Sequence, residues 1–165
     1  MKEGLGDLVL AAQRGDTMAM NDLMDELSPY VFRICGAITP QHGPDAAQET
    51  LIAVFRGLRG VREPAALRGW VRAIAVREAV RAARRHGAHP PATPVDTPAR
   101  DDGELSVDVR DALDRLSPEH RAVLVLRDLE GLDEQQAAAV LNLPQGTVKS
   151  RLHRARLSFR KAWSR

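Results

Sequence analysis

Four side chains near the C-terminus have the types that bind the phosphates and base edges of a nucleic acid. They are Lys149, Ser150, His153 and Arg154. The last 24 residues, 142–165, contain seven Lys or Arg and no Asp or Glu. An exposed helix normally pairs Lys with Glu four residues away, and no such pair is available here. The pattern favours binding to a polyanion, with a merely solvated cationic helix as the alternative.

A short helix is predicted just before these residues. It covers 132–141, because Asp133 can accept the free amide hydrogens of its first turn and Gln136 stands where a reciprocal cap would sit. The segment 142–144 ends in Pro144 and breaks the helix. Only a tight turn therefore separates the short helix from the cationic segment.

The cationic segment itself is predicted to be a helix from Gln145 onward. Apolar residues recur at spacings of four and three, at Val148, Leu152, Ala155, Phe159 and Ala162. With that stripe turned inward, Ser150 and His153 lie nearly opposite it, and Lys149 and Arg154 flank them. The two helices form a predicted helix-turn-helix whose second helix presents a face suited to a DNA major groove.

Charge is divided unevenly along the 165 residues, although the net charge is only +2. Residues 1–55 hold three basic and eight acidic side chains, whereas residues 56–86 hold nine basic and two acidic ones. Residues 107–165 hold eleven basic and eight acidic side chains. An acidic N-terminal surface and two separate basic ones indicate one protein partner and two contacts on a polyanion.

Several function classes are disfavoured. A single cysteine, Cys35, rules out an intrachain disulfide and a cysteine zinc site, and it is interpreted as a small core residue. The five histidines are dispersed, so no metal site and no cofactor are expected. The sequence shows no Walker loop, no Ser-His-Asp set and no paired carboxylates, the motifs that would indicate an enzyme. Without a leader or a long apolar run, membrane insertion is not expected and the cytoplasm is the predicted location.

The first half of the chain is predicted to be helical. Helices are expected over 7–13, 19–38, 45–58 and 66–85, with Pro29 as a bend or seam in the second of them. Asp45 is expected to cap the third helix. In that helix Leu51, Ile52, Val54, Phe55 and Leu58 are expected to face inward, with Asp45, Gln48 and Glu49 on the outside.

A proline-rich segment divides the chain. Residues 87–106 include four prolines and no apolar period, which is typical of a flexible tether. Beyond it, helices are expected over 109–116 and 118–129, the latter capped by Ser117 and ended by Gly131. No strand pattern is found. The expectation is an all-helical protein with domains at 1–86 and 107–165 and a linker at 87–106.

In this order the pieces resemble an extracytoplasmic-function (ECF) sigma factor, the two-domain class of bacterial RNA polymerase initiation factors. Three segments carry the resemblance. Residues 45–51 are similar to the Asp-x-x-Gln-Glu signature of region 2, and residues 70–75 to its Trp-Leu-x-x-Ile-Ala stretch. Residues 146–156 are similar to the region 4 recognition helix and are the most specific of the three.

The resemblance implies a role for each segment. Asp45, Gln48 and Glu49 would dock on the β′ clamp coiled coil of core polymerase, with an N-cap Asp and a solvated Glu as the less favoured alternative. The loop and helix after it would capture the melted minus-10 element, through Val61, Arg62, Glu63, Pro64, Ala65, Arg68, Arg72 and Arg77. The second helix of the helix-turn-helix would contact the minus-35 duplex, through Thr147, Lys149, Ser150, Arg151, His153 and Arg154.

The chain departs from the family at two positions. Arg77 stands where the family often has Asn, and Arg81 where it often has Asp or Asn. Both changes add positive charge, so phosphate binding gains and the minus-10 base preference is in doubt. Trp70 has two interpretations, a core residue or a platform for stacking bases, and the core is favoured.

The expected protein is a non-catalytic initiation factor, a monomer when free, that brings core polymerase to minus-35 and minus-10 elements and promotes melting. Its implied partners are the β′ clamp coiled coil, the β flap, promoter DNA and an anti-sigma factor. Two alternatives stay open. One is a polymerase-independent regulator that uses the same helix-turn-helix, usually as a dimer. The other is an interaction-only protein that sequesters an anti-sigma factor.

Overall fold

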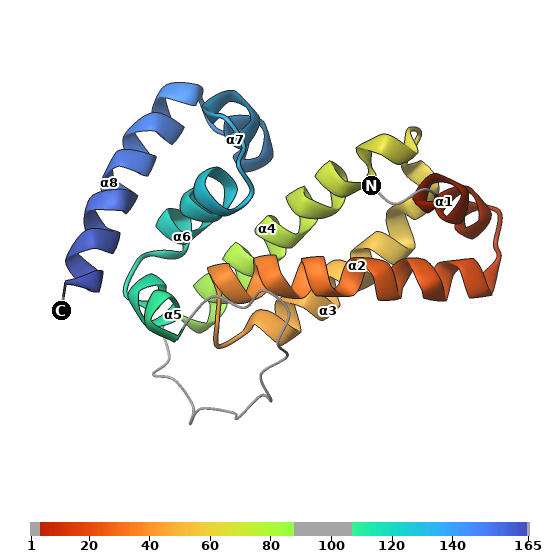
Figure 1. The fold of residues 1–165 in the computed structure, drawn as a ribbon, viewed down its shortest axis with the longest axis horizontal. Coiled ribbons are helices and arrows are strands. Elements are labelled where there is room, and N and C mark those ends of the chain that lie inside the picture. Colours follow the sequence, from red (N-terminus) through yellow and green to blue (C-terminus); the bar gives the residue numbers. More distant parts are fainter. Residues whose placement is uncertain (1–3, 88–106, 165) are drawn as a thin grey trace.

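The computed structural model describes residues 4–87 and 107–164, and throughout these ranges the regular structure is helical (Figure 1). The helices form two domains, one on each side of residues 88–106. The tether predicted at 87–106 lies, apart from Gly87, outside the described residues.

The N-terminal domain contains four helices and two short 3₁₀ turns. They are α1 (Leu5–Gln13), α2 (Thr17–Ile38), α3 (Gly43–Gly57), η1 (Leu58–Gly60), η2 (Pro64–Ala66) and α4 (Leu67–His86). Helices α2, α3 and α4 pack on one another around buried Leu23, Val31, Ile34, Val54 and Val71. Helix α2 continues through Pro29, which is exposed. Cys35 lies in this core, as expected, and burial raises the pKa of its thiol to about 12.

Two expectations for α3 are wrong. Asp45 does not cap it: the helix begins at Gly43, two residues earlier, and Asp45 is exposed in its first turn. Pro44 fits there because the first helical turn needs no amide donor from it. Ile52 and Phe55 do not face inward either, since 44% and 57% of their surfaces are exposed. The inward stripe instead passes through Ala46, Ala47, Thr50 and Val54.

The C-terminal domain is built from five segments. They are α5 (Val107–Asp114), α6 (Pro118–Leu124), the π-helical turn η3 (Val125–Leu129), α7 (Glu134–Leu141) and α8 (Gln145–Trp163). Both predicted caps are confirmed. The Ser117 hydroxyl accepts from the His120 amide at 3.3 Å, and Asp133 and Gln136 exchange hydrogen bonds of 2.7 and 3.0 Å.

The helix predicted over 118–129 changes its winding at Val125. From there the turn widens, and the amide of Glu130 donates to the carbonyl of Val125 at 2.8 Å, five residues back. Gly131 then ends the segment with φ at 69°, a left-handed conformation that favours glycine. The widened turn and the glycine set the direction in which Glu130 leaves the helix.

The two domains pack against each other. Helix α4 lies against α6 and α7, and α2 lies against α5, α6 and η3. The buried apolar side chains of both domains form one continuous cluster. In Figure 1, α8 forms one end of the molecule and α1 the other, with α4 between them.

Candidate nucleic-acid interface

Helix α8 presents the cationic face that the sequence predicts. Val148, Leu152 and Ala155 are buried against the rest of the domain. On the remaining surface, the exposed members of the predicted set are Lys149, Ser150, His153 and Arg154. Since α8 carries no acidic residue, nothing on this helix neutralises those cations. The face can therefore donate to phosphates and to base edges at once.

Two predicted members of this set lie differently. Thr147 is half-buried, and its carbonyl accepts a hydrogen bond of 3.1 Å from the Ser150 hydroxyl. Arg151 is also half-buried and lines a groove between the two domains, together with Glu119. The structure thus separates an outward group of four residues from two that border it.

The turn before α8 directs the start of this helix outward. Asn142 adopts a left-handed conformation with φ at 53° and ends α7, while Pro144 precedes the first residue of α8. The free amide groups and the positive end of the helix dipole therefore lie beside the exposed cations, where a phosphate is favourable.

In the N-terminal domain, the loop predicted for single-stranded DNA is held by Gln13, a residue that no sequence pattern singled out. The side-chain amide of Gln13 in α1 donates to the carbonyls of Leu58 and Val61 at 2.9 and 2.7 Å. Arg62, Glu63 and Ala65 remain exposed, whereas Val61 and Pro64 are half-buried. No local pattern could have revealed Gln13, because its partners lie 45 and 48 residues away.

The three predicted arginines of α4 do not form one continuous track. The Arg68 guanidinium lies 4.4 Å from the centre of the Tyr30 ring. Arg72 is half-buried, and its guanidinium lies 3.7 Å from the Glu130 carboxylate of the other domain. Arg77 is exposed further along α4, at the groove between the domains.

That groove has a volume of about 470 Å³ and a cationic rim. Its basic lining residues are Arg77, Arg81, Arg84, Arg85 and Arg151. Glu119 is the acidic residue among them, and it accepts a hydrogen bond of 2.7 Å from Arg84 Nε across the domain boundary. Burial alone would raise the pKa of Glu119, but hydrogen bonds from Arg84 and from the backbone, with the charges of Arg84 and Arg151, lower it overall.

A separate surface lies on α3. Asp45, Gln48 and Glu49 are exposed, as expected for a docking surface, and Ile52 and Phe55 continue the same exposed side along the helix. Residues 48, 52 and 55 are spaced by four and three, so the helical period was the signal that places them together. The result is an acidic start followed by an apolar patch, a composition suited to a protein partner.

Other kinds of site find no support in the part of the chain that the structure describes. Within it, no three His, Cys, Asp or Glu side chains gather in a way that suits a metal ion. None of its helices is long and apolar enough to span a bilayer.

Two protein families match this chain. Residues 23–89 match the family "Sigma-70 region 2", and residues 106–158 match "Sigma-70, region 4". The first match covers α3, the loop after it and α4, and the second covers α5 to most of α8. Each matched segment therefore contains one of the two cationic surfaces of this chain.

Curated relatives agree with this result, and solved structures share the fold. The chain is 36% identical to the ECF RNA polymerase sigma factor SigE of Mycolicibacterium smegmatis, with 88% of the chain and 63% of that relative covered. It is 31% identical to the ECF RNA polymerase sigma-E factor of Escherichia coli K12, with 94% of the chain and 93% of that relative covered.

Two solved structures have a similar fold. The sigma factor RpoE of Bartonella quintana, in complex with the anti-sigma factor NepR, has a TM-score of 0.68 at 24% identity and covers 87% and 97% of the two chains. CnrH, in complex with the cytosolic domain of CnrY, has a TM-score of 0.63 at 22% identity and covers 96% of each.

Proposed function

We propose, from the premise that this chain belongs to the ECF sigma factors of the sigma-70 family, that its two domains recognise two promoter elements and promote melting between them. Members of this family are non-catalytic and direct RNA polymerase to promoters. The observation that carries the finer assignment is the exposed, acid-free face of α8.

The α8 face is proposed to bind the minus-35 duplex. Lys149 and Arg154 can read guanine edges, Ser150 can bond to bases or phosphate, and His153 tunes the sequence that is read. Thr147 and Arg151 lie at the edge of this face and are proposed to contact the backbone.

The N-terminal domain is proposed to take the minus-10 element as a melted strand. The exposed loop residues Arg62, Glu63 and Ala65 would contact unstacked bases. The half-buried residues Val61 and Pro64 would pack beneath these three. Arg68, Arg72 and Arg77 would hold the phosphates. Trp70 packs against Gly57 at the end of α3, where an added Cβ would come within 2.8 Å of the indole ring, which agrees with its interpretation as a packing residue.

Docking on the polymerase is proposed for α3. Its acidic start, with Asp45, Gln48 and Glu49, suits a basic partner, and the β′ clamp coiled coil is the expected one. The C-terminal domain would contact the β flap. We place the domains at 1–86 and 107–165 with a linker at 87–106, and the free protein is a cytoplasmic monomer.

An anti-sigma factor is proposed as a further partner. RpoE of Bartonella quintana and CnrH were both solved in complexes, the former with an anti-sigma factor and the latter with the cytosolic domain of CnrY. The cationic groove between the domains of this chain offers an acidic partner a surface that touches both.

Run-off transcription with purified core polymerase tests the proposal. The chain should produce promoter-dependent transcripts with core enzyme and bind the same duplex weakly alone. Tight duplex binding by the free chain, with no transcript, would instead identify a polymerase-independent regulator. Failure in both assays, with capture of an anti-sigma factor, would identify an interaction-only protein.

A further inference from the structure

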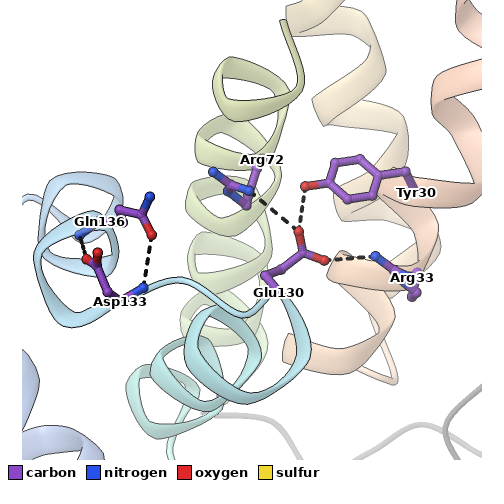
Figure 2. A network of polar contacts seen from close by, with 6 residues as sticks. All are labelled: Tyr30, Arg33, Arg72, Glu130, Asp133 and Gln136. Carbon is purple, nitrogen blue, oxygen red and sulfur yellow. Dashed lines mark hydrogen bonds and ion pairs between the residues drawn. The ribbon is translucent and has the colours of Figure 1, made fainter. Parts of the chain in front are cut away.

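Glu130 reaches from the C-terminal domain into the N-terminal one. Its carboxylate accepts a hydrogen bond from the Tyr30 hydroxyl at 2.8 Å and another from Arg33 at 2.8 Å, both in α2 (Figure 2). It also lies 3.7 Å from the guanidinium of Arg72 in α4. Only 3% of the Glu130 side chain is exposed. A single carboxylate therefore joins three side chains of the other domain.

The site that receives Glu130 carries more positive charge than the carboxylate balances. Arg33 and Arg72 contact it, and Arg68 stacks over the Tyr30 ring beside them. Two guanidinium groups thus contact one negative charge, and a third lies over the Tyr30 ring next to them. The Nε atoms of Arg33 and Arg72 are buried and have no hydrogen-bond partner among the described residues. Unused buried donors are costly, so these two guanidinium groups keep hydrogen-bonding capacity that Glu130 does not use.

Tyr30 completes a donor set suited to an anion. Burial, together with the neighbouring Glu130 carboxylate, raises the pKa of Tyr30 to about 12. Its hydroxyl therefore keeps its proton at neutral pH and acts as a donor toward an oxyanion. A donor hydroxyl between arginines can donate to a phosphate oxygen as it does to a carboxylate oxygen.

We propose that Tyr30, Arg33 and Arg72 form a binding site for a backbone phosphate of promoter DNA, and that Glu130 occupies this site in the free chain. This inference rests on the proposed function, because Arg68 and Arg72 belong to the surface assigned to the minus-10 strand. The phosphodiester and the carboxylate each carry one negative charge over two oxygens, so they compete for the same donors. Tyr30 and Arg33 thereby become DNA-binding residues, and Glu130 becomes an intramolecular competitor.

The competition couples DNA binding to the arrangement of the domains. While Glu130 fills the site, the C-terminal domain stays against α2 and α4. Filling the site with DNA removes that contact and weakens the packing of the C-terminal domain, which is then held by the Arg84–Glu119 pair and the shared apolar cluster. The apparent affinity of the free chain for DNA is lowered by the fraction of molecules that are closed.

The first test measures the distance between the domains in Glu130→Gln. Cysteines are introduced at the exposed positions Asn21 in α2 and Gln135 in α7 and carry spectroscopic labels. Native Cys35 is buried with its pKa at about 12, so it does not compete for the label. Glu130→Gln should lengthen and broaden the distance distribution. Asp111→Asn, the same charge change at an exposed site of the same domain, should leave it unchanged.

The second test measures binding of the free chain to a fluorescent single-stranded oligonucleotide of mixed sequence. If about nine molecules in ten are closed, Glu130→Gln should tighten binding about tenfold. Adding Arg33→Gln to Glu130→Gln removes a phosphate contact from an already open protein. The double variant should bind more weakly than Glu130→Gln. Its negative slope of log affinity against log salt should become shallower by about 0.7, the value of one lost phosphate contact.

The outcomes separate the parts of the proposal. An unchanged distance distribution in Glu130→Gln would overturn the competition. Opening without tighter binding, or an Arg33→Gln change that leaves both affinity and salt slope unaltered, would overturn the phosphate site. Circular dichroism on each variant confirms that both domains are folded. None of these assays contains polymerase, so wild-type transcription with core enzyme tests the sigma function independently of them.

Discussion

Lys149 and Arg154 stand on the same exposed face of α8, but their side chains differ in what they can specify. The planar guanidinium of Arg154 can bond to two acceptors of guanine, whereas the ammonium of Lys149 acts as a point charge. Both are exposed and neither is matched by an acid on α8. Base reading and phosphate binding can therefore be told apart by substitution.

Arg154→Ala should cost about 1–3 kcal/mol of binding at one minus-35 base pair, and should relax the preference for that base. The measurement is competition between promoter duplexes that differ at single positions, with the variant in complex with core polymerase. Arg160→Ala, an exposed arginine nearer the end of α8, serves as control. A uniform loss across all duplexes would show that Arg154 holds only phosphate.

His42 and His86 form a stacked pair with ring centres 3.8 Å apart, between the start of α3 and the end of α4. Burial, and then the charge of His86, lower the pKa of His42 below 6.5. The folded state thus favours the neutral ring, while the unfolded chain binds a proton more readily. Stability should fall as pH drops from about 6.5 toward the lowered pKa.

Urea unfolding at pH 7.5 and 5.5 measures this effect. Between pH 7.5 and 5.5 the free energy of unfolding should decrease more for the wild type than for His42→Gln, because the glutamine side chain does not take up a proton. His153→Gln removes an exposed histidine and should keep the wild-type difference. Equal pH dependence in wild type and His42→Gln would contradict the role of the stack.

At the scale of elements, the helix pattern was largely predictable, because apolar period, caps and glycines are local signals. The helix-turn-helix with its Asp133–Gln136 capping box follows directly from them. The errors arose where local signals compete. Asp45 resembled a cap, but Gly43 and Pro44 start the helix earlier. Ile52 and Phe55 were placed inward because apolar residues usually are, while the helical period places them beside Gln48.

The widened turn η3 shows what local pattern does not reveal. Residues 118–129 have the composition of one helix, and the extra residue in the turn becomes visible only when the end of the helix packs against α2. The extra residue in this turn places Glu130 next to its partners in the other domain. Tyr30 lies 100 residues from Glu130 in the sequence, so no periodic signal connects them.

A close helix contact offers a test at this scale. A Cβ added to Gly43 at the start of α3 would lie 2.9 Å from the backbone of Gly36 in α2, whereas a Cβ on Gly36 would meet no atom within 4 Å. Gly43→Ala should therefore destabilise the protein by about 1–3 kcal/mol, because two backbones must separate.

Gly36→Ala is the matched control for that substitution. It adds the same methyl group to the other glycine of the pair, where the methyl group meets no atom within 4 Å, and it replaces a glycine inside a helix. It should stabilise the fold by up to about 1 kcal/mol. Thermal unfolding of both variants measures the difference, and equal effects would contradict the geometry of this contact.

At the scale of the whole molecule, two cationic surfaces and one acidic surface were predictable from the distribution of charge. The packing of the two domains was not, because it depends on contacts such as Arg84 with Glu119 and Arg33 with Glu130. These join residues that are far apart in the sequence. The arrangement of the domains is thus the feature that the structure adds.

Glu49→Lys tests the docking surface on α3. Reversing the charge beside Ile52 should weaken association with core polymerase by about tenfold, chiefly through a slower association rate at low salt. Asp7→Lys makes the same charge change at an exposed site on α1 and should have little effect. Surface plasmon resonance with immobilised core enzyme measures both. Unchanged binding by Glu49→Lys would remove α3 from the docking surface.

The most direct measurement of the central claim is the mapping of transcript starts on fragmented genomic DNA with core polymerase and this chain. The proposed sigma function predicts starts that share two sequence elements at a fixed spacing. In His153→Ala only the upstream element should change, and in Arg62→Ala only the downstream one. Starts without two shared elements, or no starts above core polymerase alone, would contradict it.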